Sequence, residues 1–526
     1  MIVRKGKSLR DRRDLMLVED ERTSPARYIS DKRLSEVFMF AGQKLRDGVS
    51  SEAETALRDA IGDYHLPPDD LANLNRLLAF TLETRGDYKG SLEVVKPFDD
   101  EEMLSRLGIE TQVRVTTQLA ISYNNLGDHP KAVTLLKANL EKARANELTH
   151  LYGGIENGLA RVYRKLNECA ICRDHANNAL IYYREIGDWL GMAEAYREIA
   201  LSYHQEGSSR ESLEYFDLGI QIIGDRSAPF MLGKLYTDMS GAYWFLRRPK
   251  EGIECLEKSI VFFERTEHVL NSVMAYNNLG LNLILVGEWD RAEQMIGRAL
   301  ELAKQSDHVH VAGILDSLGE LKILRGDLNE AEELLLQAVD LAKEKKREWY
   351  QVQAMRNLAR VYLAEGRTKE AETTARETIE LSREIGDKHY ANMAGLILAE
   401  SLLAKGEVES CEGCLQSIED SDPSSDFFVL GSIQRIRGLA AIENGDKQLA
   451  LHHLNRSLTN FETAEDLYHT ALSNYLIGST IHEDDPSRAA RHLTKAGEIF
   501  KKLGVRSFEE AAASKVNLLR QASTKF

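Results

Sequence analysis

The sequence predicts an all-α fold, a solenoid of antiparallel helix pairs, because one short pattern recurs every 39 or 40 residues along the 526-residue chain. In ten repeats, a loop position rich in glycine has a small residue seven places before it and another five places after it. The loop positions are Gly127, Asn167, Gly207, Arg247, Gly287, Gly326, Gly366, Gly406, Gly445 and Asp485. The small residues before them are Ala120, Ala160, Ala200, Ser240, Gly280, Gly319, Ala359, Ala399, Gly438 and Gly478, and those after them are Ala132, Cys172, Ser212, Gly252, Ala292, Ala331, Ala371, Cys411, Ala450 and Ala490.

Two small side chains on either side of a loop allow the helices that it joins to cross closely. Glycine suits the loop because a helix often ends on a residue in the left-handed backbone conformation. Between these positions the apolar residues have helical spacing, as in Leu119, Tyr123 and Leu126. A tyrosine returns at the place of Tyr123 in the next three repeats, so we interpret it as part of the core and not as a cofactor site.

The pattern extends beyond the ten clear repeats. Gly48 and Gly86 repeat the loop position, which gives about twelve helix pairs over residues 31–502. Residues 1–30 form a basic and then acidic arm that we expect to be poorly ordered. Residues 503–526 provide one further amphipathic helix, from Leu503 to Gln521, and a tail, as expected of the cap that ends a solenoid.

These offsets, in LAISYNNLGDHPKAVTLL at 119–136 and LGLNLILVGEWDRAEQMI at 279–296, resemble the tetratricopeptide repeat. The resemblance covers nearly the whole chain and implies a right-handed superhelix. The usual unit of that family has about 34 residues, so the chain is similar to the subset with longer units. LGN-type adaptors and the repeat domains of MalT-like and other bacterial signalling regulators belong to that subset, which the segment REIGD at 184–188 and 383–387 resembles. The departures at Asn167, Arg247 and Asp485 leave the geometry of those three loops open.

Composition excludes several classes of protein. A net charge of −16 opposes general nucleic-acid binding, which normally uses a strongly basic surface. No apolar run approaches the roughly 18 residues that span a bilayer, and the basic start lacks the apolar segment of a secretory signal. We therefore expect a cytoplasmic protein with no nucleic-acid or membrane partner. The basic cluster from Arg4 to Arg13 has the composition of an arm for nucleic acid or acidic lipid, but a solvated terminus is the simpler interpretation.

The sequence predicts no metal, no cofactor and no catalytic residue. Cys169 with Cys172 and Cys411 with Cys414 have the spacing of metal ligands. However, each pair begins a second helix, the two pairs are six repeats apart, and His175 is the one histidine nearby, so we interpret them as packing residues. No phosphate loop, nucleophile elbow or zinc-protease motif is present, so we expect a protein that is not an enzyme.

The resemblance also indicates which residues line the concave face. Its inner positions lie three residues before and one, four and five residues after the first small position. Transferred to this sequence, the first of these positions gives Thr117, Asn157, Arg197, Thr237, Asn277, Asp316, Arg356, Leu396, Arg435 and Tyr475.

Three zones follow along this ladder, and together they give the predicted binding residues. The first is a positive and amide-rich zone made of Asn125, Asn157, Arg161, Arg164, Lys165 and Arg197. The second is a largely apolar zone made of Trp244, Phe245, Asn277, Leu281, Ile284 and Leu285. The third is again positive and contains Arg356, Arg360 and Arg435.

These zones predict a scaffold or adaptor that binds a protein or peptide segment, acidic or amphipathic, rich in aspartate or glutamate. An alternative is that the arginines pair with acidic neighbours such as Glu198 or Glu320, and that Trp244 and Phe245 are buried where the superhelix tightens. The apolar zone also suits self-association. A second hypothesis for function is the sensory or regulatory arm of a bacterial-type signalling or transcription regulator, with its effector domain on another chain or missing from this one.

Overall fold

The computed structural model describes residues 29–523 except residues 30, 64, 306–309, 422, 424 and 425. The chain divides between Ala275 and Tyr276 into two compact units. The predicted arm of residues 1–30 lies outside the described residues apart from Ile29. That residues 31–502 form one continuous solenoid stays a prediction.

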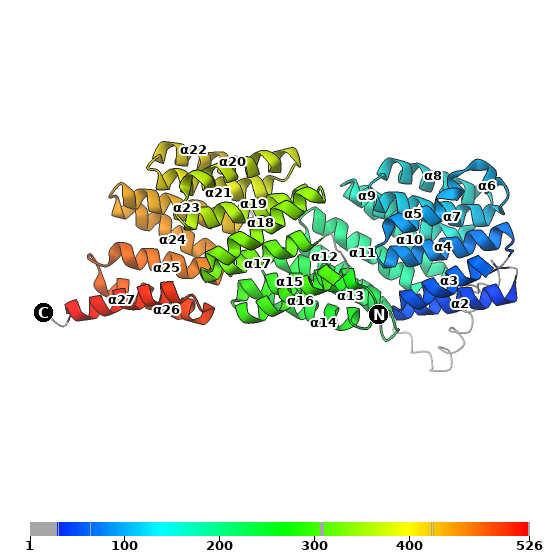
Figure 1. The fold of residues 1–526 in the computed structure, drawn as a ribbon, viewed down its shortest axis with the longest axis horizontal. Helices are drawn as coiled ribbons and strands as arrows, with labels where there is room; N and C mark the ends of the chain where they lie inside the picture. The colour runs from blue at the N-terminus through cyan, green and yellow to red at the C-terminus, as the bar shows by residue number, and fades with distance from the viewer. Residues whose placement is uncertain are drawn as a thin grey trace, which may run out of the picture. The chain divides into compact units, whose positions relative to one another are not determined.

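Each unit is built of α-helices that pair with their neighbours in sequence (Figure 1). Unit 1 contains α2 (Lys32–Asp47), α3 (Ser50–Asp63), α4 (Pro68–Thr84), α5 (Tyr88–Val95), η2 (Lys96–Asp99), α6 (Glu101–Ser105), α7 (Ile109–Asn125), α8 (His129–Ala145), η3 (Thr149–Leu151), α9 (Tyr152–Lys165), α10 (Cys169–Ile186), α11 (Trp189–Gln205), α12 (Ser209–Ile223), α13 (Pro229–Phe245) and α14 (Pro249–Phe263). The next helix, α15 (Val269–Val286), crosses the boundary between the units.

Unit 2 continues with the same alternation of first and second helices. It contains α16 (Trp289–Gln305), α17 (Val311–Arg325), α18 (Leu328–Glu344), α19 (Glu348–Ala364), α20 (Thr368–Glu384), α21 (Lys388–Ala404), α22 (Val408–Glu419), α23 (Phe427–Glu443), α24 (Lys447–Thr463), α25 (Leu467–Ile481), α26 (Pro486–Leu503) and α27 (Arg506–Ser523). The all-α solenoid fold that the repeat predicts is therefore confirmed.

The small positions lie where paired helices touch. Ala120 and Ala132 are fully buried. At Gly319 of α17, a Cβ atom would lie 2.7 Å from Leu335 Cγ of α18, which is closer than real Cβ contacts. The predicted close crossing is thus present, and its spacing follows from the size of these side chains.

The loop positions adopt the predicted left-handed conformation even at two of the three departures from glycine. The φ angle is 93° at Gly127, 62° at Asn167 and 56° at Arg247. Asp485 differs, with φ of −141°, because it occupies the N-cap place that Asp128 has after Gly127: its carboxylate accepts the backbone N–H of Arg488. Asparagine tolerates this conformation better than other residues with a Cβ atom, whereas at Arg247 the backbone adopts it against the preference of the side chain.

The recurring tyrosines are packing residues, as the sequence predicts. Tyr123 and Tyr163 are buried in one apolar core with Leu119 and Leu159. The ammonium of Lys131 lies 4.1 Å from the ring centre of Tyr123, a cation–π contact that ties α8 to α7.

The two ends of unit 1 meet. The backbone N–H of Glu267 donates to the carbonyl of Gly48 at 3.0 Å, and the Glu267 carboxylate accepts from Ser51 N at 2.7 Å and from Ser51 Oγ at 2.6 Å. His268 is 3% exposed, and its ring bonds the carbonyl of Thr84. These contacts close unit 1 into a ring of helix pairs.

Unit 2 closes on itself in a similar way. A Cβ atom at Gly287 would lie 2.6 Å from Leu503 Cδ2 and 3.3 Å from Leu467 Cδ1. The rings of Trp289 and Tyr468 have centres 6.4 Å apart. The first loop of unit 2 thus packs against α25 and α26, which are separated from it by the intervening repeats.

One described helix, α15, is long and apolar enough to cross a membrane, with 39% of its 18 residues buried within the structure. This corrects the expectation from the sequence that no apolar run reaches that length. The run contains no charged residue, although four asparagines interrupt it. A helix in the core of a repeat has the same length and apolar composition. Helix α15 packs closely on α16 in this way, because a Cβ atom at Gly280 would lie 2.2 Å from Ile296 Cγ1.

Candidate functional site

The first helices of unit 1 carry a dense group of charged side chains on the face that the ring closure turns inward. Helices α4, α9, α11 and α13 contribute to it. We call it the inner charge cluster, and it consists of Glu83, Arg161, Arg164, Glu194, Arg197, Glu198, Lys234 and Asp238.

Arg161 is at the centre of this cluster. Its guanidinium nitrogens lie 3.2 Å from Glu194, 3.4 Å from Glu83 and 3.8 Å from Glu198. Because Glu83 belongs to α4 and Arg161 to α9, the side chain reaches past α7 to a helix 78 residues earlier. Such a contact is available because closing the ring brings the first helices around one interior.

Glu198 is the acid that joins the arginines of the predicted first zone. It is 1% exposed, and it lies 2.6 Å from Arg164 and 3.5 Å from Arg197. Burial alone would raise the pKa of its carboxyl, but Arg164, Arg197 and Arg161 together hold that pKa down to about 2. Arg197 also bonds Asp238 on α13. The ion pairing that we weighed as the alternative is thus present for these arginines.

Two lysines in the same region lack this compensation. Burial and the neighbouring Arg197 lower the pKa of Lys234 to about 8, and its carboxylate contact, to Glu194, is as long as 3.9 Å. Desolvation and Arg164 lower the pKa of Lys165 as well. Lysine pKa values fall in this way where positive charge is crowded and poorly solvated. The face therefore favours an added anion.

The two asparagines of the first zone each have one side-chain atom without a hydrogen-bond partner among the described residues. Asn157 is 3% exposed, and its Nδ2 lies 3.5 Å from Glu194. Among the described residues, neither Asn157 Oδ1 nor Asn125 Nδ2 has a hydrogen-bond partner. One unsatisfied acceptor and one unsatisfied donor are the groups that a peptide backbone would match.

The predicted apolar zone falls on both sides of the boundary between the units. Trp244 is half-buried at the end of α13, and Phe245 is 68% exposed, with its ring centre 4.9 Å from that of His204. Burial of Phe245 by a tightening superhelix, which we considered as an alternative, is therefore wrong. Leu281, Ile284 and Leu285 are half-buried on α15, where Asn277 has an Oδ1 with no partner among the described residues.

The third zone lies within unit 2, and its arginines are also paired. Glu320 lies 3.6 Å from Arg356, which is 7% exposed, and 3.2 Å from Arg360, while Arg435 bonds Glu400. Asp316 accepts a hydrogen bond from Asn357 at 2.8 Å. Burial and nearby Glu320 raise the pKa of the Asp316 carboxyl to about 6, although Arg356 opposes the rise.

Sequence reasoning missed most of the acids that complete these zones. Glu83 occupies the inner position four residues after Ala79, so the same ladder would have found it in the repeat of Gly86. Glu194 and Lys234 lie six residues before the small positions Ala200 and Ser240, an offset outside the ladder.

The cysteine pairs lie at the starts of α10 and α22. Cys169, Cys172 and Cys411 are buried, and Cys414 is half-buried. Burial raises the pKa of the Cys172 thiol to about 12. In the part of the chain that the structure describes, no three His, Cys, Asp or Glu side chains form a group able to hold a metal ion.

Comparison with known proteins agrees with the geometry. Residues 260–496 match the family described as the MalT-like TPR region. The solved structure of a Rap protein complexed with competence and sporulation factor superimposes with a TM-score of 0.51 at 15% identity, over 68% of this chain and 99% of that one. The chain is thus similar to tetratricopeptide-repeat proteins in its fold and over residues 260–496. Its long repeats resemble those of the MalT-like subset, as the sequence indicates.

Other similarities of the chain are more limited. The apo form of the quorum sensor NprR from B. thuringiensis superimposes with a TM-score of 0.48 at 15% identity, over 66% of this chain and 99% of that one. Response regulator aspartate phosphatase E of Bacillus subtilis (strain 168) is 28% identical over 105 residues, which are 20% of this chain. The chain spans 28% of that relative's length.

Proposed function

We propose that the chain is a non-enzymatic interaction scaffold or adaptor whose inner face in unit 1 binds an acidic or amphipathic segment of a partner protein. The observation that carries this proposal is the crowding of positive charge at Lys165 and Lys234, where Lys234 has only a long contact with Glu194. An incoming carboxylate would supply the counter-charge that Glu194 gives Lys234 only at 3.9 Å. Charge-assisted bonds of this kind are the stronger ones in proteins.

The amides beside the inner charge cluster support binding of an extended peptide. Asn125 can donate to a peptide carbonyl, and Asn157 can accept from a peptide N–H, because these atoms have no partner among the described residues. Phe245, exposed at the end of α13, offers an apolar contact. The Rap protein of similar fold is complexed with competence and sporulation factor, which adds support by analogy.

A direct test uses fluorescence polarisation with a labelled glutamate-rich peptide and a lysine-rich peptide of the same length. Wild-type protein is expected to bind the glutamate-rich peptide with the higher affinity. Changing Lys165→Glu and Lys234→Gln together is expected to weaken that binding at least about tenfold, or roughly 1.4 kcal/mol. Lys250→Glu with Lys258→Gln, two changes on α14 with the same total change of charge, serves as the matched control.

These lysines are better targets than the arginines of the inner charge cluster. Removing one partner of a buried ion pair destabilises a protein by about 3–5 kcal/mol, so reversing Arg161 or Arg197 would confuse loss of binding with loss of folding. Equal affinity of wild type and the double lysine variant for the acidic peptide would overturn the proposal.

A second function, the sensory or regulatory arm of a signalling regulator, is favoured by the match of residues 260–496 to the MalT-like region and by the name of the Bacillus relative. We propose it as the alternative. A partner captured through the inner face that proves to be a response regulator or a transcription factor would favour it over a plain adaptor.

The proposal of a non-enzymatic role has its own test, because the Bacillus relative has phosphatase in its name. We expect purified protein to release no phosphate from p-nitrophenyl phosphate or from a phosphorylated response regulator. We further propose that the protein is cytoplasmic and that exposed Phe245 supports self-association, for which sedimentation of wild type against Phe245→Ser is the check.

A further inference from the structure

Helix α22 is shorter than the other second helices around it. Helices α18, α20 and α24 have 17 residues each, whereas α22 has 12 and ends at Glu419. A shortfall of five residues removes about 7.5 Å of helix. Beside the place where those turns are missing, the structure has a cavity of about 1040 Å³ between α20, α21 and α22.

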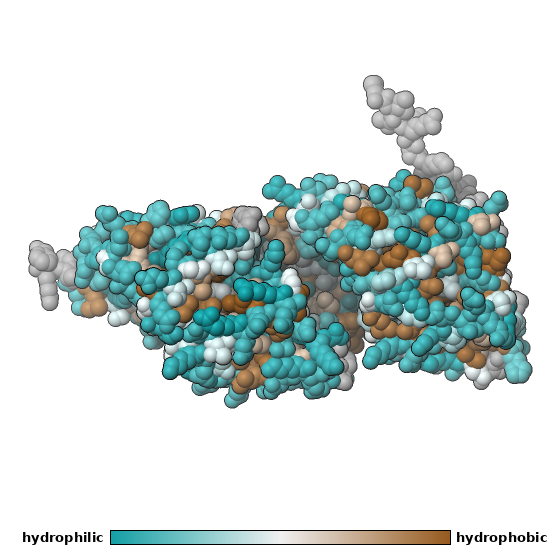
Figure 2. Space-filling view, turned by 90° about the horizontal axis from the view of Figure 1, so that it is seen from above, coloured by the Kyte–Doolittle hydropathy of each residue, from teal (hydrophilic) through white to brown (hydrophobic). Residues whose placement is uncertain are grey.

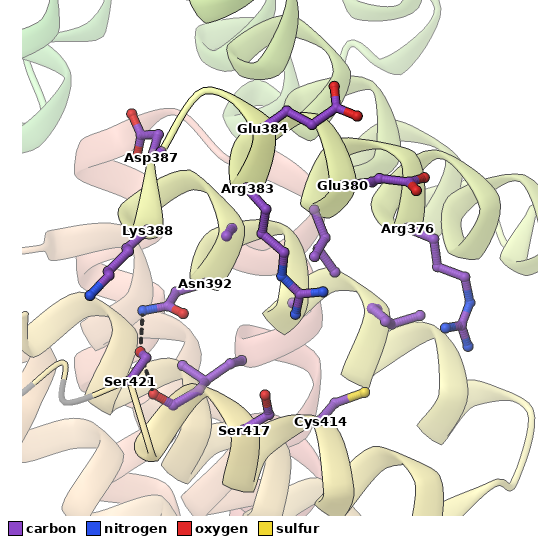
Figure 3. Close-up of a pocket in the computed structure, with 16 residues that line it drawn as sticks. Arg376, Glu380, Arg383, Glu384, Asp387, Lys388, Asn392, Cys414, Ser417 and Ser421 are labelled. Atoms are coloured by element: carbon purple, nitrogen blue, oxygen red, sulfur yellow. Dashed lines mark hydrogen bonds between the residues drawn. The ribbon is translucent and has the colours of Figure 1, made fainter.

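The floor of this hollow is apolar. Ile379 of α20, Leu398 of α21 and Ile418 of α22 line it. Just after the end of α22, the hydroxyl of Ser421 accepts a hydrogen bond from Asn392 Nδ2 of α21 at 2.8 Å (Figure 3).

Three cations, Arg376, Arg383 and Lys388, and three carboxylates, Glu380, Glu384 and Asp387, line the hollow. Arg376 and Arg383 extend from α20 toward α22, whereas Glu384 and Asp387 point away from it (Figure 3). Asp387 is engaged as the cap of α21, because its carboxylate accepts the backbone N–H of Tyr390 at 3.0 Å. Arg376 shares Glu372 with Lys405.

The side chains of Arg383 and Lys388 form no hydrogen bond or ion pair with any residue that the structure describes. Both line the hollow, one from the last turn of α20 and the other from the first turn of α21. An apolar floor below unpaired cations suits an occupant with apolar side chains next to carboxylates.

We propose that this hollow docks a helical segment of a partner protein, with apolar side chains on the floor and glutamate or aspartate against Arg383 and Lys388. The segment takes the place of the missing turns of α22. A volume of about 1040 Å³ is large enough to hold several side chains of such a segment. The site is on α20–α22 and is separate from the inner charge cluster of unit 1.

The hollow contains its own reporter. Cys414 lines it and is half-buried, while the other four cysteines are buried. Alkylation by iodoacetamide, followed by mass spectrometry of the Cys414 fragment, therefore reads occupancy at this site and not at the inner face. The probe is an acidic amphipathic peptide of about four helical turns, with leucine on one face and glutamate elsewhere. The same peptide with lysine in place of glutamate is its control.

The glutamate peptide, at ten times its Kd, is expected to slow alkylation of Cys414 about tenfold, since only free protein reacts. The lysine peptide is expected to give no protection. Arg383→Glu should remove the protection because it replaces attraction by repulsion. Lys369→Glu, an equal charge change at an exposed site at the start of α20, should keep it.

Both variants change exposed side chains, and circular dichroism checks that each is folded. Failure of the glutamate peptide to protect Cys414 in wild type, or equal protection in Arg383→Glu, would falsify the proposal. Protection that appears without peptide and grows with protein concentration would assign the hollow to a second copy of this chain and would also overturn it.

Discussion

At the scale of single residues, five described positions other than glycine have a left-handed backbone conformation. One of them is Lys346, with φ of 54°, in the loop between α18 and α19. Gly386, with φ of 76°, occupies the same place one repeat later. For residues with a Cβ atom, this conformation costs about 1–2 kcal/mol.

This pair gives a matched prediction. Lys346→Gly is expected to raise the free energy of unfolding by roughly 0.5–1 kcal/mol, because relief of backbone strain exceeds the greater freedom of glycine in the unfolded chain. Gly386→Ala is expected to lower it by a similar amount. Urea denaturation of both variants measures the two changes, and a shift of the same sign in both would contradict the explanation.

Asp316 allows a second prediction at this scale. Its folded pKa of about 6 exceeds the ordinary value of 3.8, so the folded state binds the proton more tightly than the unfolded state between those pH values. Stability of the wild type therefore falls as pH rises from about 4 to 6. Asp316→Asn keeps the acceptor for Asn357 and is expected to be more stable above pH 6, by up to about 3 kcal/mol.

Below pH 4 the two proteins should unfold at the same denaturant concentration, since both side chains are then neutral. Chemical denaturation of wild type and Asp316→Asn at pH 7 and pH 3.5 makes the comparison. A difference of the same size at both pH values would show that burial of the charge is not its cause.

At the scale of elements, the crossing of α17 and α18 depends on Gly319. A Cβ atom at this place would lie 2.7 Å from Leu335 Cγ. Gly319→Ala is expected to destabilise the protein by about 1–3 kcal/mol through overpacking. In Gly319→Ala with Leu335→Ala, the added methyl group enters space that the leucine has left, so the double variant should be more stable than the sum of single effects implies. Denaturant midpoints of the four proteins complete this cycle, and additive effects would argue against a direct clash.

Much of the architecture of the elements could be predicted from the sequence, because each repeat carries its own helix ends and crossing residues. The left-handed loop at Arg247 follows from its place in the pattern, although the residue type argues against it. The pairing of Arg161 with Glu83 could not be predicted in this way. Those residues are 78 positions apart, and a pattern with a period of 40 does not show how tightly the helices curve.

The candidate site was therefore predicted in part. The positions of the inner arginines follow from the repeat offsets, but their electrostatic state depends on Glu194 and Asp238 of neighbouring helices. The short α22 beside the hollow could be predicted from the sequence, because Pro423 and the polar residues around it end the helix before its usual length.

At the scale of the whole molecule, much of the visible surface is hydrophilic, with apolar strips (Figure 2). Each unit has a closing contact, and in unit 1 that contact includes a buried histidine. His268 stacks on Phe230 with ring centres 3.8 Å apart. Burial, with the nearby charge of Lys234, lowers its pKa to about 4, although the bond to the Thr84 carbonyl opposes the shift.

The stability that this histidine gives to the closure is therefore present in full above its unfolded pKa of about 6.5 and is lost as pH falls toward 4. His268→Gln can still donate to Thr84, so it should lose less stability than wild type between pH 7 and pH 4.5. Thermal unfolding at both pH values measures this, with exposed His482→Gln as the control. The same loss of stability in His268→Gln as in wild type would exclude His268 as its source.

The closing contact of unit 1 also affects the order in which this molecule can form. Neighbouring helix pairs make local contacts, which form early and fast, whereas Ser50 and Glu267 are 217 positions apart in sequence. During synthesis, Gly48 and Ser51 cannot form their hydrogen bonds with Glu267 until every repeat of unit 1 has left the ribosome. Until then the nascent chain is an open arc, and a polypeptide can reach the inner charge cluster from the side. In the finished protein, the same ligand has to enter along the axis of the ring or after Glu267 and His268 have separated from α3 and α4.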